Sequence, residues 1–192
     1  MPNMMNTLVV YVENKPGVLN RVASLFRRRG FNIESLTVGH TEKQGISRMT
    51  ISLDTDERGA FLVEANIYRL VNVISVENIT ARPSVYRELA MIKVAATAET
   101  RTHLMQLVTV FRARVVDVAP DSLVIEITGT EDKIDGLLEV LMAYGVIEMV
   151  RTGRVAISRG ARTAAAAAAG ANGNGKAKIG GATDDGMISY SV

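Results

Sequence analysis

The residues best suited to chemistry in this sequence lie in the turn at residues 14–17, between a short apolar run and an amphipathic segment. The first amides of a helix have no partner inside the helix and carry partial positive charge, so they bind anions such as a carboxylate. Gly17 has no side chain and leaves room for a ligand against the backbone. The turn therefore predicts a site for a small anion, with Asn14 as a hydrogen-bonding group.

A second group that could complete this site is Asn32, which the pattern places at the start of the next strand. Its amide could donate and accept hydrogen bonds from a neighbouring wall or from a second subunit. A purely structural interpretation is also open and is the commoner use of these residue types. Asn14 would then cap the helix and Pro16 would begin it. Gly17 would suit a turn and Asn32 the end of a strand.

The other reactive side chains form no catalytic or metal-binding pattern. The chain has no cysteine, and its two histidines, His40 and His103, lie in different predicted units. Neither the H-E-x-x-H spacing of zinc proteases nor the G-x-S-x-G elbow of serine hydrolases is present. Residues 170–176 match the start of a phosphate-binding loop, but Ala177 replaces the Ser or Thr that holds Mg²⁺ and no strand precedes it. We expect no metal site. A Ser-His-Asp arrangement stays open, although a lone surface histidine is the commoner case.

Composition excludes several classes of protein. The 192 residues are 47% hydrophobic and 22% charged, which allows one medium domain or two small ones with buried cores. Lys and Arg total 22 against 20 Asp and Glu, and the one compact basic run, residues 27–29, lies where it complements a helix C-terminus, so we expect no nucleic-acid partner. No signal peptide and no membrane-spanning apolar stretch is visible. We expect a cytoplasmic protein that makes no membrane contact.

Two similar series of elements follow one another along the chain. The first is a strand (7–13), a helix from residue 18 to a stop at Gly30, strands (31–41 and 47–53), a helix (60–70) and a strand (73–80). The second is a strand (86–96), a helix (99–111), strands (114–119 and 123–129), a helix (131–144) and a final extended stretch (146–158). Each series has the order βαββαβ of the ferredoxin-like fold. We therefore predict an α+β fold of two tandem ferredoxin-like units.

Some details of these elements can also be predicted. The alternation of apolar residues changes phase between Ile33 and Leu36, which indicates a β-bulge or a sheet face that contacts a partner. In the helix at 60–70, Phe61 and Ile67 are expected to face the core. Residues 161–192 are rich in Ala and Gly and are predicted to be a flexible, low-complexity tail.

Several segments of the chain, taken together, indicate a family. They are ENKPGVLNRVASLFRRRGFNIESLTVGHTE (13–42), SRMTISL (47–53), RELAMIKV (87–94), FRARVVDVAP (111–120) and SRG (158–160). Together they resemble the regulatory small subunits of acetolactate synthase (acetohydroxyacid synthase, AHAS). The stretches RGFNIESLTV and SRMTI carry the resemblance, because N-x-P-G-x-L alone would identify only an ACT domain.

The resemblance implies an N-terminal ACT domain (1–82) that pairs edge to edge with a second copy, followed by a small-subunit domain (83–160). It also implies that valine, and sometimes leucine or isoleucine, binds where two ACT domains meet. The effector-binding residues implied are Asn14 and Gly17 in the loop, Val18 and Leu19 beside it, and Asn32 and Ile33 from the partner's strand. Asn20 stands where relatives often have Ser, which affects the size and polarity of the pocket.

The resemblance further implies that this chain holds no cofactor and does no chemistry. It would activate a large catalytic subunit that holds thiamine diphosphate, Mg²⁺ and FAD and condenses pyruvate with pyruvate or 2-oxobutyrate. It would also transmit feedback inhibition by valine in branched-chain amino-acid biosynthesis. The alternative is a stand-alone amino-acid-sensing ACT module that regulates another enzyme or a transcription factor, although no helix-turn-helix is visible. An enzyme with activity of its own is a third, weaker interpretation.

Overall fold

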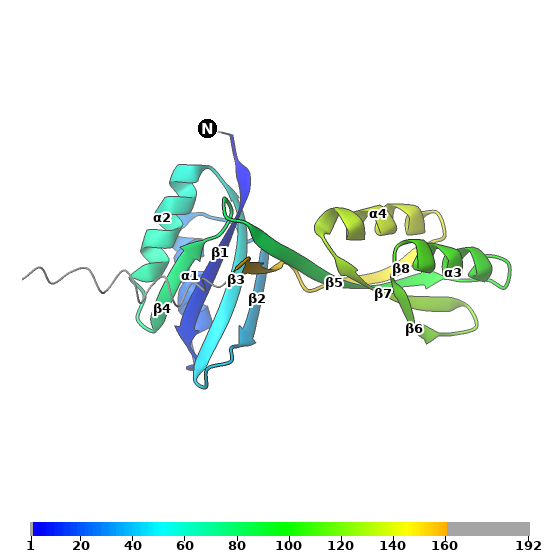
Figure 1. Cartoon of the computed structure of the whole chain (residues 1–192), viewed down its shortest axis with the longest axis horizontal. Coiled ribbons are helices and arrows are strands. Elements are labelled where there is room, and N and C mark those ends of the chain that lie inside the picture. The colour runs from blue at the N-terminus through cyan, green and yellow to red at the C-terminus, as the bar shows by residue number, and fades with distance from the viewer. Residues whose placement is uncertain (1, 161–192) are drawn as a thin grey trace, which may run out of the picture.

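The computed structural model describes residues 2–160, which form two units that each have an antiparallel sheet and two helices (Figure 1). The first unit contains β1 (Met4–Glu13), α1 (Val18–Arg29), β2 (Ser35–His40), β3 (Ile46–Thr55), α2 (Glu57–Tyr68) and β4 (Val73–Asn78). The second contains β5 (Ser84–Ala95), α3 (Arg101–Val110), β6 (Arg114–Val118), β7 (Ser122–Gly129), α4 (Glu131–Met142), β8 (Val146–Arg151) and β9 (Val155–Ser158). The sheet orders are β2-β3-β1-β4 and β6-β7-β5-β8. The predicted α+β fold of two tandem ferredoxin-like units is confirmed, and the predicted tail lies outside the described residues.

Each unit has its own hydrophobic core between the sheet and its helices. In the first unit, Leu8 and Val10 occupy alternate positions of β1 and are both buried in the core. Because successive strand residues point to opposite faces, alternate residues share one face, and here that face is the one that the helices cover. Val22 and Phe26 lie four residues apart on one side of α1 and complete this core. The periodicity of the apolar residues thus determines which face of β1 and α1 is buried.

Helix α2 begins with a side-chain cap, because Asp56 Oδ1 accepts a hydrogen bond of 2.7 Å from the amide of Gly59. The N-cap residue of α4 is Thr130, whose backbone is also extended but whose side chain makes no capping bond. We expect Asp56→Ala to lower the free energy of unfolding by about 1 kcal/mol and Thr130→Ala by clearly less. Denaturant unfolding of the two variants measures this difference, and equal losses would mean that the Asp56 bond does not stabilise α2.

The final extended stretch predicted at 146–158 is two strands, which corrects the sequence interpretation. Gly153 has φ +77° and breaks the run between β8 and β9. β8 pairs with the second half of β5, and β9 pairs with its first half. Figure 1 shows β5 running from the first unit into the second. The β5–β9 ribbon packs on the first sheet through a small apolar cluster of Val9, Ile79 and Ala156.

The strand predicted from residue 31 begins only at Ser35, and no bulge interrupts its pairing with β3. Helix α1 ends at Gly30 in a left-handed conformation, and the amide of Phe31 still bonds to Phe26 O at 3.1 Å. Residues 31–33 therefore belong to the helix exit, and the amide of Glu34 already bonds to Ser52 O of β3 at 2.9 Å, which explains the change of phase after Ile33. The predicted bulge is wrong for this strand.

The core prediction for α2 is partly wrong. Phe61 is 68% exposed, whereas Ala60, Val63 and Ile67 are buried at a helical spacing of three and four residues. Small and β-branched side chains at these positions let the helix lie close to the sheet, and the larger aromatic ring is left on the outer face.

Candidate functional site

The start of α1 leaves several backbone amides unpaired. Gly17 is the N-cap residue, with φ 82° and ψ −7°, and no side chain caps the helix. The amide of Val18 lies 3.4 Å from Lys15 O, while the amides of Leu19 and Asn20 have no acceptor within residues 2–160. We call the amides of residues 17–20 the helix mouth. Such unpaired amides, together with the helix dipole, attract an anion.

Glycine at position 17 is favoured for two separate reasons. Its φ lies in the left-handed region that other residues adopt at a cost of about 1–2 kcal/mol. A Cβ built on Gly17 would meet no heavy atom within 4 Å, so the space beside the backbone is open. The second observation agrees with the prediction that Gly17 leaves room for a ligand.

A network of polar side chains beside the helix mouth fixes the turn. Glu13 Oε2 lies 2.8 Å from Lys15 Nζ and accepts a hydrogen bond of 2.5 Å from Asn72 Nδ2. Arg21 Nη1 donates to Asn72 Oδ1 at 2.7 Å. Asn72 has φ 74° and joins the turn before β4 to the end of β1. Asn72 was not among the residues predicted from the sequence, although Asn is one of the few residues that accept positive φ readily.

The hydrogen bond from Lys15, a second one from Asn72 and the charge of Lys15 together lower the pKa of Glu13 below its ordinary value of 4.5. Because the folded pKa is lowered, the stabilisation by the carboxylate is complete above the ordinary value and is lost as the pH falls through the lowered one. We expect Lys15→Met to raise the Glu13 titration midpoint, followed by NMR of its carboxyl carbon, and the remote Lys133→Met to leave it unchanged. An identical midpoint in Lys15→Met would show that Lys15 does not hold this carboxylate.

The structure places the first group of predicted site residues around the helix mouth. The side chain of Asn14 is exposed, and its backbone amide donates to Gly45 O at 2.8 Å. The structural interpretation of Asn14 as helix cap and of Pro16 as first helical residue is wrong, since the helix begins at Val18 after Gly17. The side chain of Val18 is buried in the core, so only its backbone faces the mouth. Leu19 is 44% exposed beside it.

The second group lies at the opposite end of α1. Asn32 is exposed, and its Nδ2 donates to Glu34 Oε1 at 2.6 Å, while Ile33 packs partly on the first core. Asn32 does not open a strand as predicted, because β2 starts at Ser35, three residues later. At about 1.5 Å per residue, the 12 residues of α1 separate Asn32 from Gly17 by about 18 Å. A single chain therefore does not bring the two groups together.

The strand that follows Asn32 forms an edge of its sheet. β2 pairs only with β3 among the described strands, and β4 forms the other edge. Val38 is 47% exposed, and Gly39 and His40 after it are also exposed. An exposed edge of this kind is able to pair with a strand of another chain.

The remaining groups suggest no other chemistry. His40 lies in β2 and His103 in α3, and within residues 2–160 no three His, Asp or Glu side chains are grouped as metal ligands. None of the described helices has both the length and the apolar composition to cross a bilayer. The basic residues Arg27–Arg29 occupy the last turn of α1, where they complement its dipole.

Comparison with known proteins assigns a family to this arrangement. The family described as "AHAS small subunit-like ACT domain" matches residues 8–75, and that described as "Small subunit of acetolactate synthase" matches residues 87–160. A probable acetolactate synthase small subunit of Archaeoglobus fulgidus is 51% identical over 157 residues, which cover 82% of this chain and 98% of the relative. The chain belongs to the family of acetolactate synthase small subunits. The family resemblance stated from the sequence is thereby confirmed.

Further relatives of this small subunit support the same family assignment. The acetolactate synthase small subunit of Mycolicibacterium smegmatis is 50% identical over 157 residues, covering 82% of this chain and 92% of the relative. The crystal structure of the acetolactate synthase small subunit from Thermotoga maritima is similar with a TM-score of 0.77 and 38% identity, over 83% of this chain and 99% of that chain. The similarity extends over both units, so this small subunit has the fold of its family over residues 8–75 and 87–160.

Proposed function

We propose that this small subunit binds valine, or another branched-chain amino acid, at the helix mouth and thereby inhibits the catalytic subunit of acetolactate synthase. The observation that carries this proposal is the open helix mouth at Gly17, with unpaired amides at Leu19 and Asn20. The ligand's carboxylate accepts hydrogen bonds from these amides. The exposed side chain of Leu19 provides an apolar contact for the branched side chain.

The site is completed by a second copy of the chain. Gly17 and Asn32 lie at opposite ends of α1, and α1 leads directly into the edge strand β2. When two β2 strands pair across a two-fold axis, their helices also run antiparallel, so the start of one helix lies beside the end of the other. Asn32 and Ile33 of one copy then face Gly17 of the other. This arrangement explains why one chain alone keeps the two groups apart.

The partner of the dimer is the large catalytic subunit, which holds thiamine diphosphate, Mg²⁺ and FAD and condenses pyruvate with a second 2-oxo acid in the cytoplasm. The small subunit contributes no group to the reaction. It activates the large subunit, and valine favours an arrangement of the complex with lower activity. A coupling free energy of about 1–3 kcal/mol between the valine site and the catalytic site of the large subunit is sufficient for this control. A stand-alone ACT module has less support, because the second unit also matches a small-subunit family.

The test is reconstitution with the large subunit of the same organism. We expect the small subunit to raise the rate of acetolactate formation, valine to reverse this rise, and the small subunit alone to be inactive with pyruvate. Calorimetry of the small subunit with valine is carried out in parallel. A complex that forms but responds to no branched-chain amino acid, together with no heat of binding, would contradict the proposed inhibition.

A further inference from the structure

The connection between β8 and β9 contains Arg154, which joins the two units through its backbone. The Arg154 amide donates to Ser35 Oγ at 3.3 Å, and the Arg154 carbonyl accepts from Thr37 Oγ1 at 3.3 Å. Ser35 and Thr37 are alternate residues of the edge strand β2 and point to the sheet face away from the helices. This short segment of the second unit is therefore attached to the strand that follows Asn32.

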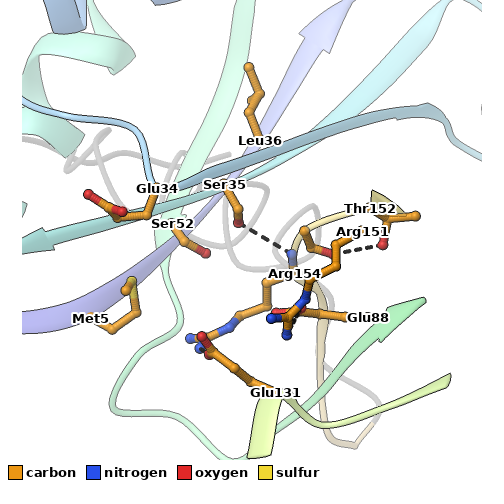
Figure 2. A pocket seen from close by; sticks show the side chains of 11 residues that line it. Met5, Glu34, Ser35, Leu36, Ser52, Glu88, Glu131, Arg151, Thr152 and Arg154 are labelled. Atoms are coloured by element: carbon orange, nitrogen blue, oxygen red, sulfur yellow. Dashed lines mark hydrogen bonds and ion pairs between the residues drawn. The ribbon is translucent and has the colours of Figure 1, made fainter. Parts of the chain in front are cut away.

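The side chain of Arg154 reaches in the other direction as well (Figure 2). Its Nη2 lies 2.5 Å from Oε2 of Glu131, the first residue of α4, and its guanidinium lies 5.4 Å from the ring centre of Tyr86. Nη1 donates to Thr7 Oγ1 of β1 at 3.4 Å. The Arg154 side chain is only 19% exposed, whereas the Glu131 side chain is 46% exposed, so water screens the ion pair from the Glu131 side. One residue thus connects β1 and β2 with the start of α4.

The surroundings hold the backbone of this residue but leave space for its side chain. A Cβ on Gly153 would come within 2.8 Å of Ser35 Cβ, so the connection lies directly against β2. A cavity of about 430 Å³ opens beside Arg154 and is lined by polar residues of both units, including Glu34, Glu88 and Arg151. A guanidinium next to such a space is able to move without repacking a core, as a two-state contact requires.

We propose that Arg154 is the positioning residue that couples the effector site to the second unit, by linking the position of β2 to that of α4. This inference rests on the proposed function, because it requires a ligand at the helix mouth that orders the segment around Asn32 of a second copy. β2 follows that segment directly, so a change in its position is transmitted to the Arg154 backbone and through Glu131 to α4. The residue touches neither effector nor substrate.

The neighbouring Arg151 provides a matched control. It lies 2.8 Å from Glu88 and 2.7 Å from Asp135, and both partners belong to the second unit. Arg151→Gln therefore breaks a pair of ionic contacts of similar burial without separating the two units. It reports the effect of a weakened second unit alone.

The test uses the reconstituted complex and compares wild type with Arg154→Gln, Thr37→Val and Arg151→Gln. For Arg154→Gln we expect a valine Kd within about threefold of wild type, activation within about twofold, and a maximal inhibition that falls by at least about half. Thr37→Val, which removes only the bond to the Arg154 carbonyl, changes the maximal inhibition in the same direction. Arg151→Gln lowers the unfolding midpoint but keeps the inhibition.

Three results would count against this inference and are distinct from failure of the proposed function. Full inhibition in both Arg154→Gln and Thr37→Val overturns it. Equal loss of inhibition in Arg151→Gln also overturns it, because the effect would then come from a weakened second unit. Thr37→Val keeps both side chains of the Arg154–Glu131 ion pair. A parallel loss of valine affinity and activation in this variant would therefore mean that the contact between Arg154 and β2 has only a structural role. A wild-type complex that neither binds valine nor responds to it refutes the proposed function itself, and the inference falls with it.

Discussion

Replacing Gly17 with Asp is expected to weaken valine binding by at least about tenfold and to make the complex insensitive to valine at concentrations that inhibit wild type. The new carboxylate would occupy the open space beside the helix mouth, where the carboxylate of the ligand is proposed to lie. Two like charges about 4 Å apart repel by roughly 4 kcal/mol near a protein surface, which exceeds the 1.4 kcal/mol of a tenfold change. Activation of the catalytic subunit should be largely retained.

The control for this substitution is Gly17→Asn, which has nearly the same shape without the charge. Asp and Asn accept the left-handed conformation of position 17 more readily than most residues, so the cost of φ 82° is similar in both variants. Calorimetry with valine gives the ratio of the two dissociation constants. Equal affinities for Asp and Asn would exclude an anion site at the helix mouth, whereas a weaker Asp variant supports it.

Replacing Val38 with Lys is expected to prevent pairing of the ACT domains and to reduce valine affinity by more than about tenfold. Val38 is 47% exposed on the edge strand β2, and a lysine on an edge strand opposes pairing with another strand. A two-fold axis would also bring the two new charges close together. The chain should stay folded, because position 38 is not part of either core.

The matched control is Ile74→Lys on the opposite edge of the same sheet. Ile74 lies in β4 and is 45% exposed, so the two substitutions change exposed apolar residues of equivalent burial. Analytical ultracentrifugation should give a monomer for Val38→Lys and a dimer for Ile74→Lys. A dimer that survives Val38→Lys and still binds valine would place the interface elsewhere.

The sequence was sufficient to predict the fold because its apolar residues follow the structural periods closely. Leu8, Val10 and Val12 alternate in β1, and all three are buried. The helix stop at Gly30 was also predictable, since its left-handed conformation is one that glycine adopts without cost. Phe61 was misjudged because hydrophobicity alone does not choose between two neighbouring helix faces, and the tight packing of Ala60 and Val63 decides the outcome.

The candidate site was only partly predictable. The turn at Gly17 has a local signal, and its open helix mouth follows from residues close in sequence. The role of Asn72 depends on contacts with Glu13 and Arg21, which are more than fifty residues away, so no local pattern indicates it. The same holds for Arg154, whose contacts with Thr7 and Ser35 arise from the way the second unit returns to the first. Such residues become visible only when the fold is known.

The proposed valine site between two copies is tested most directly by an NMR titration of the ¹⁵N-labelled small subunit with valine. We expect shifts of the backbone amides of residues 17–20 and of the Asn32 side-chain amide. In a dimer of one labelled and one unlabelled copy, we also expect contacts between bound valine and both chains. Saturating valine that leaves the amides of residues 17–20 unchanged, or that binds entirely within one copy, would contradict the proposed site.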